Sequence, residues 1–311
     1  MTKIHVLYGF SPQLAPFRGL SAAESIALLR EWGVQAVFGG YDNAAFVDAA
    51  HAAGLQVFAE FGCFVGERWW DRYPESRPVT ADGRLMPKQG WYAGVIPTLP
   101  ALRQELLAGL EKLVMEKDLD GVWLDFIRWP TRWESPDPAL YQTSFDPRTL
   151  QRFQADTGIR IPTELKRPEE IALWVLSEQG ERWTAWRCEQ ITSFVRQAGE
   201  ITKRAARRPC LLGLFSVPWR TADFDGAIIR VMGGEPGVRG TSLRWRPMWI
   251  SSRRWSSTSS AGKGLPGSRR FLPTPCHPRW RGHSKRRRPD TGSRCGDRGR
   301  LGRPARPPWS G

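Results

Sequence analysis

One carboxylate stands near the end of an apolar stretch of strand length. Residues 119–130 read LDGVWLDFIRWP, and Asp125 falls near the end of the run from Val122 to Ile127. A run this apolar is typical of a strand buried on both faces, as in parallel sheets. Burying a carboxylate there is costly unless it is paired or used. Asp125 is therefore the first candidate for a reacting group; the alternative is a structural pair with Arg128 that ends the strand.

Glu60 ends another predicted strand and makes a carboxylate pair conceivable. Neighbouring strands lie about 4.8 Å apart, so Glu60 and Asp125 could face one another across a pocket. Carboxyl groups about 5.5 Å apart suit retaining glycoside hydrolysis, and roughly 6.5–9.5 Å suits inversion. We expect Asp125 to be the nucleophile or charge stabiliser and Glu60 the acid/base with a raised pKa. Glu60 could instead bind a ligand or pair with an Arg, and the acid could be Glu134 or lie beyond residue 235.

Arg128 is expected to hold a substrate hydroxyl or to orient Asp125. In an extended strand it would point away from the face of Asp125, so this role requires a local bend. Asp120, at the start of the same strand, is expected to be structural. Tyr41 and Asp42, which follow the second predicted strand, are further substrate-binding candidates.

Aromatic residues are abundant on the loops that would surround such a site. Indole rings stack on the apolar faces of sugars, but large aromatics also simply pack long loops, and both interpretations stay open. Rings beside Arg could also bind single-stranded nucleic acid, a weak reading here because residues 1–235 are net acidic. The loop aromatics are Trp69, Trp70, Trp91, Tyr92, Trp129, Trp133 and Trp219. Substrate binding is assigned to Trp91, Tyr92, Trp129 and Trp219.

Strand and helix patterns alternate along the first 215 residues and would position these groups. Ser21 and Glu24 have the spacing of a capping box at the start of the first helix. The alternation predicts a parallel α/β fold. Two long loops, 62–97 and the stretch from residue 128 to 146, fit an incomplete (β/α)8 TIM barrel with its site at the carboxyl ends of the strands. The predicted strands are 4–8, 35–38, 55–61, 121–127 and 210–215, and the predicted helices are 22–32, 44–53, 102–117, 147–157 and parts of 168–206.

The net charge of +15 is confined to the last quarter of the chain. Residues 236–311 contain 19 of the 46 Lys and Arg but two of the 31 acids, so residues 1–235, with 27 basic and 29 acidic side chains, carry −2. The last quarter contains no Glu, Gln, Asn or Tyr. Its low aliphatic content and high charge predict disorder. We therefore divide the chain into a (β/α) barrel at 1–235, strands one to five, and a basic Arg/Pro/Gly/Ser-rich tail at 236–311.

A shifted reading frame explains this tail better than a dedicated basic arm. In the shifted frame, each codon consists of the third base of one original codon and the first two bases of the next. Read in this way from Gly240, the chain permits an amino-acid sequence that contains D-V-D-I-F-S-P-M-V-F-H. The Met248/Trp249 and Trp249/Ile250 junctions force its first V and the D that follows that V. This text has the pattern of an apolar strand followed by a turn. The break would lie between Met232 and Gly240, and the C-terminal strands of the barrel would be lost.

Several classes of protein are disfavoured by what the chain lacks. Before residue 236 it has His5 and His51 alone, which disfavours a Ser-His-Asp triad or a His-rich metal site. No CxxC occurs, so neither zinc nor a disulfide framework is indicated. Dinucleotide-type glycine loops are absent, and we expect no cofactor. No secretory signal or membrane-spanning run is evident, which favours a cytoplasmic protein with reduced thiols and no membrane partner.

The segment at 120–130, DGVWLDFIRWP, resembles the D-G-[VI]-x-x-D-[FY]-[IV]-R-[FW]-P signature of glycoside-hydrolase-like TIM-barrel proteins, which are mostly known from sequence. The shifted text D-I-F-S-P-M-V-F-H resembles their later D-x-[FI]-S-P-M-x-Y strand. The resemblance covers about residues 3–235, most strongly 35–130. It implies a barrel, a carbohydrate substrate, and Asp125 as the catalytic carboxylate with Arg128 as its companion. The chain departs from the pattern after about Met232, so an acid on strands six to eight stays open.

These observations favour a glycoside-hydrolase-like protein that acts on an O-glycosidic bond with paired carboxylates. The alternatives are a non-catalytic carbohydrate-binding barrel or an inactive pseudogene product. A binding barrel would show the same Trp residues but no second carboxylate within about 10 Å of Asp125. No specific nucleic-acid partner is expected. The sugar, its linkage, the anomeric outcome and the oligomeric state are not selected by these residues.

Overall fold

The computed structural model describes residues 4–132 and 140–215, which belong to the first of two compact units, 1–251 and 252–311. The predictions made for Trp133, Glu134, Trp219 and the tail at 236–311 lie outside the described residues.

A parallel sheet of five strands forms the centre of the described chain, in the order β1-β2-β3-β4-β5. This confirms the expected α/β class. Within residues 4–132 and 140–215, β1 and β5 are the edge strands of the sheet. The strands are β1 (Val6–Phe10), β2 (Ala36–Gly39), β3 (Gln56–Gly62), β4 (Gly121–Asp125) and β5 (Leu211–Leu214).

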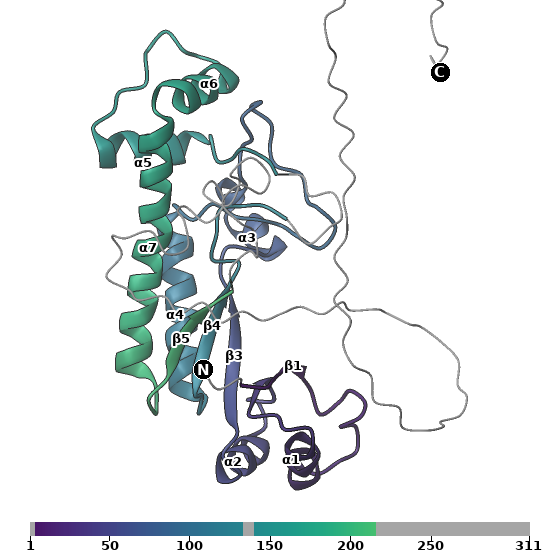
Figure 1. Ribbon diagram of the computed structural model, residues 1–311. Coiled ribbons are helices and arrows are strands. Elements are labelled where there is room, and N and C mark those ends of the chain that lie inside the picture. The colour runs from purple at the N-terminus through teal and green to yellow at the C-terminus, as the bar shows by residue number, and fades with distance from the viewer. Residues whose placement is uncertain (1–3, 133–139, 216–311) are drawn as a thin grey trace, which may run out of the picture. The chain divides into compact units, whose positions relative to one another are not determined.

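Helices connect the strands, and α4 and α7 lie side by side along one face of β3, β4 and β5 (Figure 1). The capping box of α1 forms as predicted, with Ser21 accepting from the backbone N–H of Glu24. The helices are α1 (Ala22–Glu31), α2 (Ala44–Ala52), α3 (Glu67–Arg72), α4 (Pro100–Glu116), α5 (Pro147–Thr157), α6 (Pro168–Glu178) and α7 (Gly180–Ala205), with a 3-10 turn, η1 (Pro74–Ser76).

Helix α3 and the turn η1 correct the expectation of an unbroken loop at 62–97. The six residues of α3 follow Gly66, which gives the helix no side-chain cap. The helix is held instead by packing, because Trp69 is buried and contributes to the main core. Its sequence carries neither a cap nor a long period, which are the two signals by which helices are recognised.

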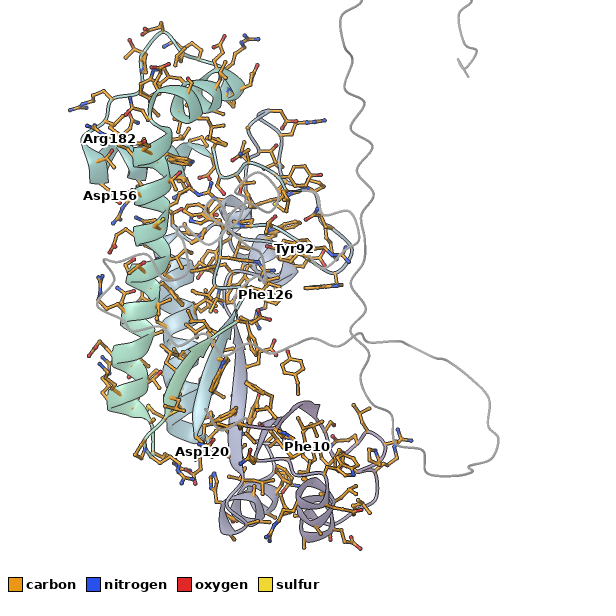
Figure 2. All side chains as sticks on the ribbon, viewed as in Figure 1. Phe10, Tyr92, Asp120, Phe126, Asp156 and Arg182 are labelled. Atoms are coloured by element: carbon orange, nitrogen blue, oxygen red, sulfur yellow. The ribbon has the colours of Figure 1, made fainter. Side chains whose placement is uncertain are left out.

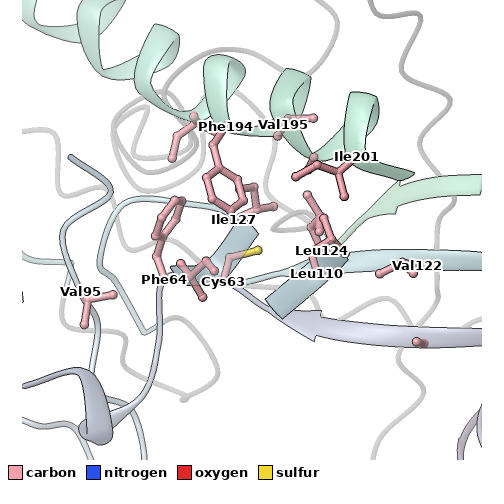
Figure 3. Packing of buried hydrophobic residues seen from close by; sticks show 14 of the residues in the cluster. Cys63, Phe64, Val95, Leu110, Val122, Leu124, Ile127, Phe194, Val195 and Ile201 are labelled. Carbon is pink, nitrogen blue, oxygen red and sulfur yellow. The ribbon is translucent and has the colours of Figure 1, made fainter. Parts of the chain in front are cut away.

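The outer face of the sheet packs against the helices. Val57, Val122 and Leu124 point to this side and join the large core cluster. Figure 3 shows Cys63, Phe64 and Leu124 gathered with side chains of α4 and α7, among them Leu110, Phe194, Val195 and Ile201. This packing fixes the position of the carboxyl ends of β3 and β4.

The inner face of the sheet carries a second, smaller cluster built from aromatic rings. Phe38, Phe58 and Trp123 pack there, with ring centroids 4.6 to 5.3 Å apart. Trp123 pairs with Gly213 across β4 and β5, and a Cβ at Gly213 would lie 2.1 Å from Cε2 of Trp123. Glycine is therefore required beside the indole, and the aromatic layer forms a floor below the carboxyl ends of the strands.

Asp120 lies at the opposite end of β4 from Phe126 (Figure 2). Its carboxylate accepts from the backbone N–H of Val57 at 2.7 Å and contacts His51 Nε2 at 2.9 Å. Arg208 Nε lies 3.6 Å from the same carboxylate. These contacts tie α2, β3 and the segment before β5 together and agree with the structural role expected of Asp120.

Candidate active site

A sharp turn at the end of β4 brings Asp125 and Arg128 to the same region. Phe126, directly after Asp125, has φ 50°, a left-handed conformation that costs a residue with a Cβ about 1–2 kcal/mol. Its backbone N–H donates to Asp125 Oδ1 at 2.7 Å. Arg128 is buried, with Cζ 4.8 Å from the centre of the Phe126 ring. This turn is the local bend that a role for Arg128 beside Asp125 requires.

The structure brings Glu60 and Asp125 together on the inner face of the sheet. Glu60 pairs with Trp123 in the parallel ladder, and Asp125 pairs with Gly62, so the two acids are diagonal neighbours on adjacent strands. Their side chains share a hydrogen bond. Two carboxyl groups can form such a bond when one of them carries the proton.

The acidity of Asp125 is perturbed by its surroundings. Burial raises the pKa of Asp125 to about 7, and the charge and hydrogen bond of Glu60 add to that rise. The Phe126 N–H and the Arg128 guanidinium act in the opposite direction. A raised pKa was expected for Glu60, with Asp125 as the charged partner. For Asp125, burial favours the protonated form of the carboxyl group into the neutral pH range.

Tyr8 is a site residue that the sequence analysis missed. Its hydroxyl donates to Glu60 Oε2 from β1, across the intervening strand β2. Partial burial and the bond to Glu60 hold the pKa of Tyr8 above its ordinary value. The predicted first strand, 4–8, ends at Tyr8. An aromatic residue with a polar hydroxyl at a strand end is the sequence signal that could have indicated a site residue.

Tyr41 and Asp42 line an open pocket of about 380 Å³ that follows β1 and β2, together with residues 10–13. Burial raises the pKa of Tyr41, and the charges of Asp42 and Glu60 add to the effect, so Tyr41 lies within electrostatic reach of Glu60. Asp42 is 79% exposed and forms an ion pair with Lys117 at 2.7 Å. Tyr41 thus senses the charge of Glu60, whereas the carboxylate of Asp42 is paired with Lys117 at the surface.

The predicted aromatic residues separate into one exposed ring and two buried ones. Trp91 is 57% exposed and meets Phe126 edge to face at 5.7 Å. Tyr92 is buried, and its hydroxyl accepts from the backbone N–H of Thr131. Trp129 is fully buried, and its indole N–H donates to the carbonyl of Arg187. Of these three rings, Trp91 is the exposed one, with Arg132 Cζ 5.8 Å from its centre; the other two pack the loops.

Among residues 4–132 and 140–215, no three His, Cys, Asp or Glu side chains are grouped so that they could hold a metal ion. In the same residues, no helix is long and apolar enough to cross a bilayer.

No protein-family model matches the chain, and no curated protein matches it. Solved structures do. The glycoside hydrolase domain of PgaB (BpsB) from Bordetella bronchiseptica is 12% identical with a TM-score of 0.51, over 74% of this chain and 69% of that one. This similarity shows a shared fold, and the chain therefore has the glycoside-hydrolase-like α/β fold of TIM-barrel type that the sequence predicts.

Two larger enzymes are also similar at lower scores. The α-L-fucosidase isoenzyme 2 from Paenibacillus thiaminolyticus is 15% identical over 72% of this chain, with a TM-score of 0.42. The β-galactosidase from the psychrophilic Marinomonas ef1 is 13% identical over 68%, with a TM-score of 0.47. The matched part of the chain spans 34% of the fucosidase and 37% of the β-galactosidase.

Proposed function

We propose that this protein is a glycoside hydrolase that uses Asp125 and Glu60 as its catalytic carboxyl pair on an O-glycosidic bond. The observation that carries the proposal is the direct contact of these two groups at the carboxyl ends of β3 and β4. A barrel that only binds carbohydrate has no need of a second carboxylate beside a buried Asp. The carboxyl ends of parallel strands are also where barrels of this class hold their catalytic groups.

In the proposed reaction, Asp125 is the general acid and Glu60 the charged partner. A group with a pKa of about 7 keeps much of its proton at neutral pH and can donate it to the leaving glycosidic oxygen. Glu60 attacks the anomeric carbon as the bond to the leaving oxygen breaks, which forms a glycosyl ester. Asp125 then takes a proton from water, the water oxygen attacks the anomeric carbon, and the ester bond to Glu60 breaks, so both carboxyl groups return to their starting states. Contact between the two carboxyl groups is nearer to the separation of about 5–5.5 Å used for retention than to that used for inversion, so we propose a retaining outcome.

The surroundings of the pair suggest where the sugars bind. The pocket beside Tyr41 lies on the side of β1 and β2 and offers hydroxyl, amide and carboxylate groups to one sugar. The exposed ring of Trp91 packs on Phe126, the residue whose backbone holds Asp125, and would stack a second sugar. The bond between these two sugars would then lie at Asp125.

The test is turnover of a panel of nitrophenyl glycosides by the wild-type chain and by Asp125→Asn and Glu60→Gln. Loss of a general acid or of its carboxylate partner is expected to lower kcat about 10²- to 10⁴-fold. Glu111→Gln, which removes a surface carboxylate of α4 bonded to Arg204, is the matched control and should leave turnover unchanged.

The outcomes separate the two functions. Turnover within twofold of wild type in Asp125→Asn would refute the catalytic role of Asp125. Saturable sugar binding by the wild-type chain, with hydrolysis of none of the glycosides, would favour the carbohydrate-binding barrel.

A further inference from the structure

We propose that Tyr8 is a positioning residue that holds Glu60 as the charged member of the carboxyl pair and so leaves the proton on Asp125. The inference rests on the proposed function for its catalytic meaning, while its structural part concerns the hydrogen bonds of the pair alone. It assigns the roles of two otherwise similar carboxyl groups.

The Glu60 carboxyl group has hydrogen-bond partners on two sides. The Tyr8 hydroxyl donates to Glu60 Oε2, and the side chain of Asp125 shares a hydrogen bond with the same carboxyl group. A hydrogen bond from a neutral hydroxyl is stronger when its acceptor is charged. The Tyr8 donor therefore favours the carboxylate form of Glu60, and the proton of the pair stays on Asp125.

The aromatic floor fixes the ring of Tyr8 in place for this task. Its centroid lies 5.6 Å from that of Phe38 and 5.9 Å from that of Phe215, and the second contact is edge to face. These rings come from β2 and from the residue after β5, so Tyr8 is held between strands that are distant in the sheet. Such support keeps the hydroxyl aimed at Glu60 without a substrate.

The Tyr8 hydroxyl also remains a hydrogen-bond donor over the pH range in which enzymes work. Partial burial and Glu60 hold the pKa of Tyr8 above its ordinary value, so the hydroxyl keeps its proton at neutral and mildly basic pH. The other groups that act on the pair are the Arg128 guanidinium, which favours a charged Asp125, the buried thiol of Cys63, and Tyr41 beside Glu60. Of these, Tyr8 is the group that makes a hydrogen bond to Glu60 within the described residues.

The experiment follows the two carboxyl groups separately by carbon-13 NMR, using the full chain labelled at Asp Cγ and Glu Cδ. Asp125→Asn and Glu60→Gln assign the two resonances. In wild type, Asp125 is expected to titrate near neutral pH. In Tyr8→Phe, the midpoint of Asp125 should fall by about 1 pH unit and that of Glu60 should rise, because a hydrogen bond to a charged group is lost.

The matched control is Tyr73→Phe. The Tyr73 hydroxyl donates to Glu105 at 2.9 Å. The substitution therefore removes the same type of tyrosine–carboxylate hydrogen bond at a different carboxylate. It should leave the titration midpoint of Asp125 unchanged. A second comparison is made in the Glu60→Gln background. If Tyr8 acts through Glu60, adding Tyr8→Phe to that variant should not change the midpoint further.

An Asp125 midpoint that is the same in Tyr8→Phe and wild type, with both folded by circular dichroism, overturns the proposal. So does an equal shift in the Glu60→Gln background. The NMR measurement needs no turnover, so its failure is separate from failure of the proposed hydrolase. Where turnover is found, Tyr8→Phe should lower kcat about tenfold with KM within twofold of wild type, as expected for a residue that acts on the reacting groups and not on the substrate.

Discussion

At the scale of single residues, the acid pair shows how far a sequence pattern can assign chemistry. An isolated carboxylate in an apolar strand and a second one at the end of another strand were enough to nominate Asp125 and Glu60. Their roles could not be assigned in the same way, because acidity depends on burial and on a partner that is distant in sequence. The turn at Phe126 and the bond from Tyr8 are tertiary features of this kind.

Asp125 should weaken the folded chain at neutral and basic pH. Its pKa is raised to about 7, so the folded state binds this proton more tightly than the unfolded state, and stability falls as pH rises from about 4 to 7. Asp125→Asn removes the charge. We expect the free energy of unfolding of this variant to exceed that of wild type by about 1–2 kcal/mol at pH 8 and to match it at pH 4. Urea denaturation at both pH values measures the difference.

Asp82 offers a control, because its pKa is shifted in the opposite direction from that of Asp125. Hydrogen bonds from Arg84 and Thr80 lower the pKa of its carboxyl to about 2, so replacing it with Asn should not stabilise the chain at pH 8. A variant Asp125→Asn that is less stable than wild type at pH 8 would contradict the assignment of a strained, buried acid.

At the scale of elements, period and capping located most of the strands and helices. The capping box of α1 and the alternation in β3 and β4 are local signals, and these elements begin within a few residues of their predicted positions. Strand β1 is shifted toward Phe10 because its pairing with β2, and not its own apolar run, determines which residues it includes. Trp129 is similar: its burial under α7 depends on a helix that starts fifty residues later.

The pairing of Trp123 with Gly213 gives a prediction at this scale. Gly213→Ala would place a methyl group against the indole, and we expect a loss of about 1–3 kcal/mol in the free energy of unfolding. Gly199→Ala is the control. Gly199 lies inside α7, and a Cβ there would meet Leu212 of β5 at 3.8 Å, an ordinary contact distance. This substitution should raise the free energy of unfolding by about 0.5–1 kcal/mol. Thermal and chemical denaturation of both variants measure the difference. Equal stability of Gly213→Ala and wild type would show that the indole can move away at no cost.

At the scale of the whole molecule, residues 4–132 and 140–215 form a sheet of five parallel strands in which β1 and β5 are the edges. A strand with unpaired backbone groups and apolar side chains is prone to aggregation. Tyr8 on β1 and Leu211 on β5 are both more than half exposed. Residues 236–311 lie outside the described residues, and the reading-frame hypothesis for them stays a prediction.

We therefore expect that deleting one base or adding two near codon 235 gives a better folded protein, because the shifted text restores apolar strands in place of Arg-rich sequence. The two versions can be compared by thermal melts and by limited trypsin digestion. The restored chain should melt cooperatively and resist cleavage. A cooperative melt of the chain as written, with 236–311 protected from trypsin despite their many Arg residues, would contradict the hypothesis.

The proton shared by Asp125 and Glu60 also has a consequence for inhibitors. A ligand that brings its own positive charge between the two groups, such as a protonated imino sugar, takes over the role of that proton and should expel it into solution. Its apparent affinity would then increase with pH below neutrality and level off above about pH 7. Calorimetry in buffers with different ionisation enthalpies would register the release directly, as an observed heat of binding that depends on the buffer.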